Sequence, residues 1–191
     1  MAQKVVKSNK KASKRETKKS ITPVNIGTDH IWGSIDAPVS IVEYGDYQCP
    51  YTGMAYPIVN EIMKRFNTKV YFVFRNFPLN DIHPNAQHSA EAAEAAAAQD
   101  KFWEMHDYLF EHQNALDDSH LLLYAEKLGL DTNKFKNEMS GHTYAPLIKE
   151  SLKSGIDSGV QGTPTFFVNG NRYQNSWDLE TFSNFLKTLN T

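Results

Sequence analysis

The pattern of hydrophobic and polar positions changes twice along the chain. Residues 39 to 44, "VSIVEY", are mainly β-branched and aromatic and lie between a proline and a glycine, which predicts a buried strand. Apolar residues then recur at helical spacing from Ala55 to Phe66, and "VYFVF" at 70 to 74 predicts a second strand. Strand, tight turn, helix and strand at this distance indicate a βαβ unit.

Residues 84 to 158 show only helical patterns. The alanine-rich stretch "NAQHSAEAAEAAAAQDKFWEMHDYLFEHQ" is expected to form the first of four helical pieces, because its small side chains share one face and permit close packing. The second piece has Asp118 or Ser119 available as its N-cap and Gly129 as its end, and the third ends at Gly141. Four pieces without a strand indicate an inserted helical bundle.

Strand character returns after the helical segment. In "TPTFFVNGNRYQ" two short β-prone runs flank Asn169 and Gly170, a strong hairpin signal. A closing amphipathic helix is predicted to start at Asp178. The predicted class is α/β, with a sheet split around the helical insert. We expect residues 21–79 and 159–191 to form the sheet-containing domain, residues 80–158 to form the insert, and residues 1–20 to form a separate arm.

Charge separates this arm from the rest of the chain. The first 19 residues hold eight Lys or Arg and one Glu, a charge of +7, which leaves −9 for the other 172 residues. Such a run predicts a disordered, solvated arm, and contact with nucleic acid or an anionic membrane is the alternative. Nothing after the arm resembles a basic groove, so nucleic acid is not expected as the main ligand. No apolar stretch is long enough to span a bilayer, and no signal peptide follows the basic residues. These features predict a cytoplasmic protein, or a secreted or membrane-associated one if a natural leader is missing from this sequence.

The composition includes a single cysteine. Hydrophobic content of 40 % fits a globular domain, and the chain holds a single cysteine, Cys49. One cysteine excludes an internal disulfide and any zinc site that needs several thiolates. Any sulfur that pairs with Cys49 must therefore come from another molecule.

Cys49 lies where the first strand ends and the helix begins, in "DYQCPYTGMAYP". Unpaired backbone N–H groups and the positive end of the helix dipole favour the thiolate, which is the reactive form. Pro50 suits the first helical position because it has no N–H to lose. The polar Asp46 and Gln48 and the adjacent tyrosines suggest an exposed turn, although a buried, inert cysteine is the alternative.

Several motifs together carry a family resemblance. "CPYT" after a hydrophobic strand, Pro57, and "GTPTFFVNG" near the C-terminus resemble the thioredoxin superfamily. The long insert, "FRNFPL", "HPNAQHSAEAAEAA" and "KFWEMHDYLFEHQ" resemble its DsbA-like branch of thiol:disulfide oxidoreductases. The resemblance covers roughly residues 24 to 190. It implies a thioredoxin-like fold, exchange of thiols and disulfides with protein substrates, and no bound cofactor.

The resemblance also implies roles for particular residues. Cys49 matches the attacking cysteine, and Pro164, preceded by Thr163, matches a cis-proline whose loop lies against the sulfur and pairs with an extended substrate. An ordinary trans proline is the alternative. Substrate contacts are expected from Thr163, Pro164, Pro50 and Tyr51. Glu43 matches a buried acid that assists proton transfer; the alternative is a strand-edge residue that faces water.

Thr52 departs from the family pattern. Family members usually have a second cysteine here, which attacks the mixed disulfide and releases the substrate. A threonine cannot do this, although its hydroxyl could hydrogen-bond to the Cys49 thiolate. An external thiol, such as glutathione or another low-molecular-weight thiol, would have to complete the cycle. The predicted catalytic residues are therefore Cys49, Thr52 and Glu43, in a monothiol site.

Other features and functions remain as alternatives. The seven histidines form no H-x-x-x-H unit with an acidic ligand, so we expect surface or packing roles and no metal site. Phe102, Trp103, Tyr108 and Phe110 are expected in the core of the insert. One alternative function is a redox-inactive, peptide-binding or chaperone-like module. Another is a glutathione-dependent transferase or isomerase, whose turnover would survive the loss of Cys49.

Overall fold

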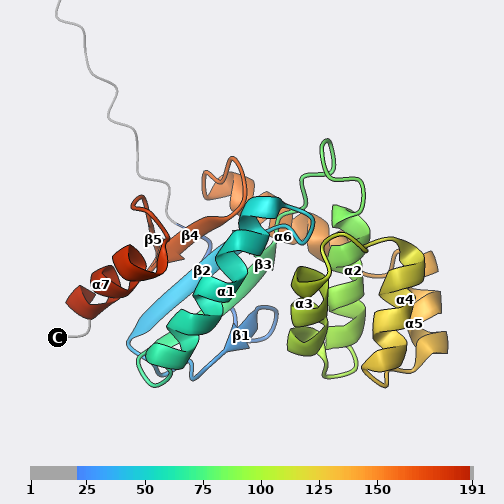
Figure 1. Cartoon of the computed structure of the whole chain (residues 1–191). Helices are drawn as coiled ribbons and strands as arrows, with labels where there is room; N and C mark the ends of the chain where they lie inside the picture. Colours follow the sequence, from blue (N-terminus) through green and yellow to red (C-terminus); the bar gives the residue numbers. More distant parts are fainter. Residues whose placement is uncertain (1–20, 190–191) are drawn as a thin grey trace, which may run out of the picture.

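One mixed sheet of five strands organises the computed structural model, which describes residues 21–189 (Figure 1). The strand order is β1-β3-β2-β4-β5. The strands are β1 (His30–Trp32), β2 (Val39–Gly45), β3 (Val70–Asn76), β4 (Thr165–Val168) and β5 (Asn171–Arg172). β2 pairs with β3 in parallel, and the other neighbours are antiparallel. The arm predicted for residues 1–20 lies outside the described residues.

The predicted βαβ unit is confirmed. β2 and β3 are joined through α1 (Pro50–Arg65), and all seven residues of each strand are in register, from Val39 opposite Val70 to Gly45 opposite Asn76. α1 and α7 (Leu179–Leu189) pack on the face of the sheet that carries Ile41, and their apolar residues share one core with it. β1 was not predicted, because three residues are too few to show an alternating pattern.

The other face of the sheet is covered by α6 (Ala145–Asp157) and by the segment before β1. Figure 1 shows α6 behind the sheet and α1 in front of it. Leu152 of α6 and Ile21 pack on a second cluster around Tyr44 and Val73. Gly155 permits the close approach of α6, because a Cβ there would lie 2.6 Å from the ring of Phe77. The sheet is therefore buried on both faces around β2.

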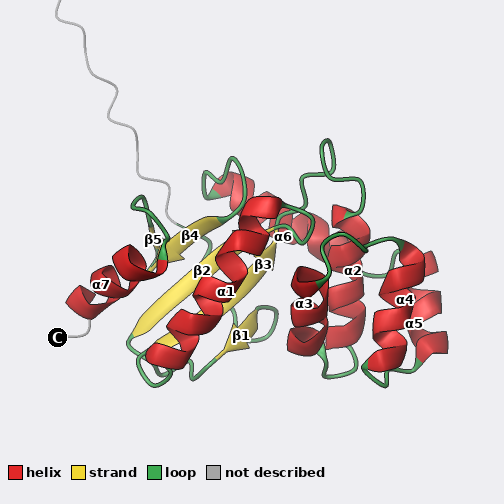
Figure 2. Ribbon diagram, viewed as in Figure 1, coloured by secondary structure: helices red, strands yellow, loops and turns green. Residues whose placement is uncertain are grey.

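The insert contains five helices between β3 and β4, one more than predicted (Figure 2). They are α2 (Ala86–Ala97), α3 (Phe102–Glu111), α4 (Asp118–Lys127), α5 (Thr132–Ser140) and α6. The expectation of one alanine-rich helix was wrong, because Asp100 adopts a positive φ of 62° and separates α2 from α3. The predicted cap was also wrong: Asp117 is the N-cap of α4, and its side chain accepts hydrogen bonds from the backbone N–H groups of Ser119 and His120.

Other local predictions are confirmed. Asn169 and Gly170 have positive φ values of 47° and 76° and join β4 to β5. Asp178 accepts a hydrogen bond from the Thr181 N–H at the start of α7, and Gly129, with a φ of 72°, follows the end of α4. These positions depend on neighbours in sequence, so local chemistry was enough to find them.

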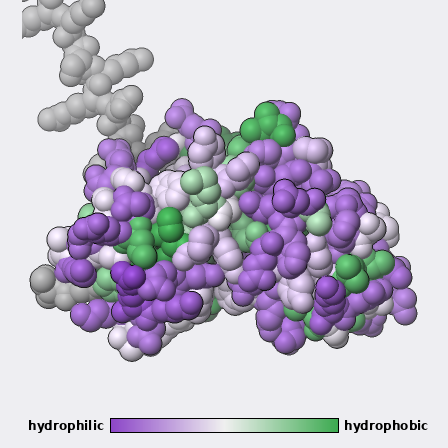
Figure 3. Space-filling model, viewed as in Figure 1, coloured by the Kyte–Doolittle hydropathy of each residue, from purple (hydrophilic) through white to green (hydrophobic). Residues whose placement is uncertain are grey.

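The larger of the two hydrophobic clusters continues from the sheet into the insert. Phe72 and Phe74 of β3 belong to the same cluster as Phe102 and Phe110 of α3, which confirms the predicted core role of these two residues. Trp103 and Tyr108 are partly buried and pack against the cluster. The face seen in Figure 3 is largely hydrophilic, and its hydrophobic side chains form small separate groups. The predicted segment boundaries at 79/80 and 158/159 stay a prediction.

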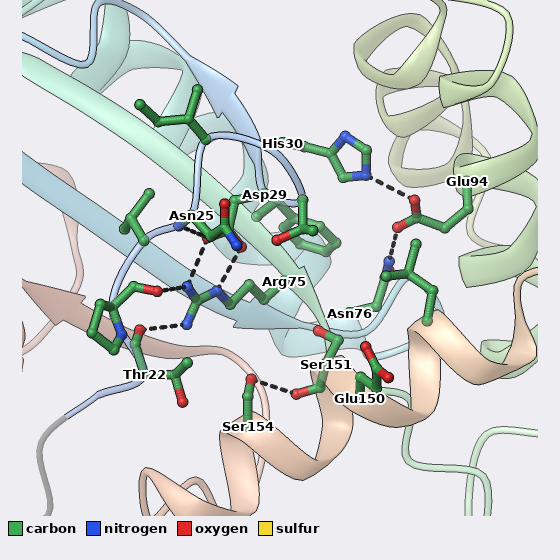
Figure 4. A pocket seen from close by; sticks show the side chains of 16 residues that line it. Thr22, Asn25, Asp29, His30, Arg75, Asn76, Glu94, Glu150, Ser151 and Ser154 are labelled. Carbon is green, nitrogen blue, oxygen red and sulfur yellow. Dashed lines mark hydrogen bonds and ion pairs between the residues drawn. The ribbon is translucent and has the colours of Figure 1, made fainter.

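Arg75 at the end of β3 fixes the segment before β1 to the sheet (Figure 4). Its guanidinium donates to both carboxylate oxygens of Asp29 at 2.8 Å, to the carbonyls of Thr22 and Pro23, and to the Tyr44 hydroxyl. Because both charged side chains are buried, Arg75→Leu should lower the free energy of unfolding by about 3 kcal/mol, as measured by urea denaturation.

The matched control is Arg65→Leu. Arg65 forms an exposed i,i+4 pair with Glu61, so its loss should cost less than about 1 kcal/mol. Equal losses for the two variants would show that Arg75 does not anchor this segment.

Candidate active site

Cys49 is the N-cap residue of α1, at the end of the turn that follows β2. Its φ and ψ are −71° and 120°, and Pro50 follows at the first helical position. The Cys49 N–H donates to the Asp46 carbonyl at 3.1 Å, and the Cys49 carbonyl accepts from the Gly53 N–H at 3.0 Å. The predicted position at the helix start is confirmed.

The Cys49 sulfur faces a loop that is distant in sequence. Cys49 Sγ lies 3.3 Å from the Thr163 carbonyl oxygen, and the Thr163–Pro164 peptide bond is cis. The alternative of a trans proline is therefore wrong. Antiparallel pairing of β4 with β2 brings the two segments together, because Thr165 lies opposite Tyr44 in the register. The fold thus brings together three of the predicted site residues, Cys49, Thr163 and Pro164.

The expectation of an exposed turn around Cys49 was largely wrong. Cys49 is 4 % exposed, and Asp46 and Tyr47 are also buried. Tyr47 packs against Phe110 of the insert and its hydroxyl lies 3.1 Å from Nδ1 of His106, so the insert covers the turn. The burial of Cys49 agrees with the hypothesis of a buried, inert cysteine. Its contact with the Thr163 carbonyl agrees with the hypothesis of a reactive cysteine.

Glu43 is buried in the central strand β2. It is 3 % exposed, and its Oε1 has no hydrogen-bond partner among the described residues. Desolvation raises the pKa of Glu43 to about 8. The alternative of a strand-edge residue facing water is wrong, because β2 lies between β3 and β4. Glu43 is therefore largely protonated near neutral pH.

Thr52 occupies the first turn of α1, three residues after Cys49, and is buried. Its Oγ1 has no hydrogen-bond partner within the part of the chain that the structure describes, so no bond joins it to the Cys49 sulfur. The hydrogen bond predicted between the Thr52 hydroxyl and Cys49 is therefore not seen in this structure. An unpaired buried hydroxyl at this position leaves a donor available.

Pro50 and Tyr51 lie at the surface beside this site. Tyr51 is 63 % exposed, and Met54, one turn along α1, is also exposed. Ile82, 68 % exposed, lies in the loop after β3, whose Leu79 N–H donates to the Asp46 carboxylate. Exposed apolar side chains near the turn could contact an extended substrate.

The sequence did not reveal which polar side chains hold the turn through hydrogen bonds. Asp46 accepts from the N–H groups of Gln48 and Leu79 and lies 2.8 Å from Nδ1 of His83. Gln113, between α3 and α4, donates to two carbonyls of the turn. Most of these partners are more than 30 residues apart along the chain, so no local pattern could reveal them.

A cavity of about 650 Å³ lies away from this turn. It lies between the segment before β1, the end of β3, α2 and α6, and is lined by Arg75, Asn76 and Glu94 among others (Figure 4). Glu94 accepts a hydrogen bond from the Asn76 side chain and lies 2.9 Å from Nε2 of His30. Arg75 donates to the Asp29 carboxylate. Arg75, Asp29, Glu94 and His30 therefore contact one another in pairs within the lining and support the fold.

Two properties of the described residues bear on cofactors and membranes. Residues 21–189 contain no group of three or more His, Cys, Asp or Glu side chains placed to hold a metal ion. Within the same range, each helix is too short or too polar to cross a bilayer. His106, buried against Tyr47 and Phe74, has a pKa lowered to about 3 by desolvation, which agrees with the predicted packing role.

The chain belongs to the thioredoxin family, whose model, described as "Thioredoxin", matches residues 25–188. Its fold is the thioredoxin-like fold that the resemblance implied. BdbD from Bacillus subtilis superposes with a TM-score of 0.78 at 24 % identity, covering 91 % of this chain and 98 % of BdbD. The thiol-disulfide exchange protein alpha-DsbA2 from Wolbachia pipientis gives 0.74 at 20 % identity, covering 85 % and 87 %.

Sequence relatives carry a different name. The protein named Na(+)/H(+) antiporter NhaA 1 from Salinispora arenicola is 47 % identical over 163 residues, which are 85 % of this chain and 25 % of that protein. The chain thus spans about a quarter of the length of the relatives it matches. The antiporter name describes a much longer protein, so it assigns no ion transport to this chain.

Proposed function

We propose that this chain is a thiol-disulfide exchange protein that acts through Cys49 alone. The observation that carries the proposal is the 3.3 Å approach of Cys49 Sγ to the Thr163 carbonyl oxygen, beside Pro164. A sulfur held at a helix start and next to the cis-proline loop is suited to bind an extended chain. Thr163, Pro164, Pro50 and Tyr51 would contact that chain.

The proposed reaction has two balanced steps. The Cys49 thiolate attacks the glutathione sulfur of a protein–glutathione disulfide, so the S–S bond to the protein breaks, a Cys49–glutathione disulfide forms, and the protein thiolate takes up a proton. A second glutathione then attacks the adduct and restores the Cys49 thiolate. Together, the protein–glutathione disulfide and one free glutathione give the protein thiol and glutathione disulfide, in which one half comes from the substrate and the other from the added glutathione. Another low-molecular-weight thiol could replace glutathione.

Two further residues have proposed roles in these steps. Glu43, protonated near neutral pH, would supply a proton to the leaving thiolate. Thr52 would donate its unpaired hydroxyl to the Cys49 thiolate. Because threonine is not a nucleophile toward disulfides, release would depend on the concentration of the external thiol.

Transfer from a glutathionylated peptide tests the proposal. The unmodified protein should gain one glutathione at Cys49, seen by mass spectrometry, and release it when glutathione is added. Cys49→Ser should lose both steps, at least about 1000-fold, because a serine alcohol does not attack disulfides. Ser34→Ala, at an exposed position between β1 and β2 where the hydroxyl accepts from the Asp36 N–H, serves as the control that should change neither step.

The burial of Cys49 favours one competing function, a peptide-binding module without exchange chemistry. That function predicts peptide binding with no transfer above the Cys49→Ser level. A glutathione-dependent transferase or isomerase would instead keep its turnover in Cys49→Ser. Each of these outcomes would contradict single-cysteine exchange.

A further inference from the structure

Gln113 joins the helical insert to the turn that carries Cys49. It lies in the connection between α3 and α4, and its Nε2 donates to the Tyr47 carbonyl at 2.7 Å and to the Cys49 carbonyl at 3.0 Å. These carbonyls belong to the peptide groups on either side of the Gln48–Cys49 pair. One side-chain amide therefore fixes the backbone both before and after the cysteine.

The first turn of α1 is shaped to receive Gln113. A Cβ added at Gly53 would lie 2.0 Å from Oε1 and 2.6 Å from Cδ of Gln113, so only glycine lets the amide approach this closely. The Gly53 N–H donates to the same Cys49 carbonyl that Gln113 contacts. Gly53 and Gln113 thus act on one carbonyl oxygen.

The direction of the sulfur depends on this backbone. Cys49 Sγ meets the Thr163 carbonyl at 3.3 Å, and a rotation of the adjacent peptide groups would move the sulfur away from that loop. The Cys49 side chain has no capping hydrogen bond within α1 that could hold it instead. Gln113 contacts the backbone and not the sulfur, so it can act only through the orientation of Cys49.

We propose that Gln113 is a positioning residue: through the Tyr47 and Cys49 carbonyls it holds the Cys49 sulfur against the Thr163–Pro164 loop. The catalytic consequence rests on the proposed function of Cys49. In this arrangement the helical insert sets the geometry of the reacting sulfur, and Gly53 provides the space for it to do so.

Three variants perturb this contact in different ways. Gln113→Ala removes both hydrogen bonds, and Gln113→Glu keeps the size of the side chain but loses the amide donor. Gly53→Ala keeps the amide and displaces it. The matched control is Gln99→Ala, because Gln99 also lies in the insert and bonds the Asp131 backbone far from the turn.

Two measurements follow the position of the sulfur. The chain has one cysteine, so a Raman spectrum at acidic pH shows a single S–H stretching band that reports its hydrogen bond. The second measurement is the rate of mixed-disulfide formation with the glutathionylated peptide, per folded molecule. We expect Gln113→Ala to shift the S–H band toward that of a free thiol and to slow the rate about tenfold, because small displacements of reacting groups are costly.

Gln113→Glu and Gly53→Ala should give the same shift, and the double variant Gln113→Ala/Gly53→Ala should be no slower than either single variant, because both act through one contact. Gln99→Ala should change neither measurement. If the band and the rate in both Gln113 variants match those of Gln99→Ala, the positioning role is wrong. If the unmodified protein does not exchange, the proposed function fails, and the S–H band alone decides whether Gln113 places the sulfur.

Discussion

Replacing Thr52 by cysteine should make the release of glutathione from Cys49 independent of added thiol and at least about 100-fold faster than in the unmodified protein. The reason is proximity: Thr52 lies three residues after Cys49 in the first turn of the same helix. A thiol held there would attack the Cys49 adduct intramolecularly and form a disulfide between residues 49 and 52. The measurement is the lifetime of the glutathione adduct by mass spectrometry, together with the loss of two hydrogens from the released protein.

The surroundings of Thr52 can accommodate the substitution by cysteine. The residue is buried beside Gly45 and Phe74, and a cysteine is similar in volume to the threonine it replaces. Thr52→Ser is the matched control, because it keeps a hydroxyl and provides no thiol, and its adduct should be as long-lived as that of the unmodified protein. An adduct of Thr52→Cys that persists without added thiol would show that the first turn of α1 does not bring these two positions together for exchange.

Glu43→Gln should stabilise the protein increasingly as the pH rises from 4.5 to about 8. Burial raises the pKa of Glu43 from 4.5 to about 8 in the folded state. Between these values the folded protein retains a proton that the unfolded chain has lost, so the unmodified protein loses stability as the pH rises. At about 1.4 kcal/mol per pH unit the full difference is on the order of 5 kcal/mol. Urea denaturation at pH 4, 6 and 8 measures it.

Glutamine lacks this titration, so the gain in the free energy of unfolding should be small at pH 4 and largest at pH 8. Glu61→Gln, at an exposed position of α1, serves as the control and should keep the pH dependence of the unmodified protein. A gain in Glu43→Gln that is the same at all three pH values would mean that Glu43 is not held protonated by burial. The same variant should slow glutathione transfer if Glu43 supplies the proton.

Where the sequence predicted the fold well, the signal was local. The βαβ unit followed from residue types over about 35 positions, and the hairpin at Asn169 and Gly170 followed from two residues that tolerate positive φ. The errors were also informative. Asp100 separates α2 from α3 through a positive φ, which the hydrophobic periodicity does not reveal. The residue types predicted Asp118 or Ser119 as the N-cap of α4, whereas the structure has Asp117.

The sequence predicted several residues of the candidate site but not the residues that surround them. Cys49 at a helix start and the buried Glu43 could be proposed from one strand and one turn, and the family resemblance added Pro164. The covering of the turn could not be predicted, because Tyr47 is buried by α3, which begins more than 50 residues later. Gln113 has no distinguishing pattern of its own and gains its role only from the carbonyls it meets.

By itself the sequence determined the order of the elements, the single sulfur at the start of a helix and the absence of a second thiol three residues later, because these depend on residue type and short spacing. The tertiary structure alone decided that the Thr163 carbonyl faces the sulfur, that Glu43 loses its contact with water, and that Gln113 holds the turn. The physical reason is that these three properties arise from contacts between segments that are far apart in sequence, which form only when the strands pair and the insert packs beside the sheet.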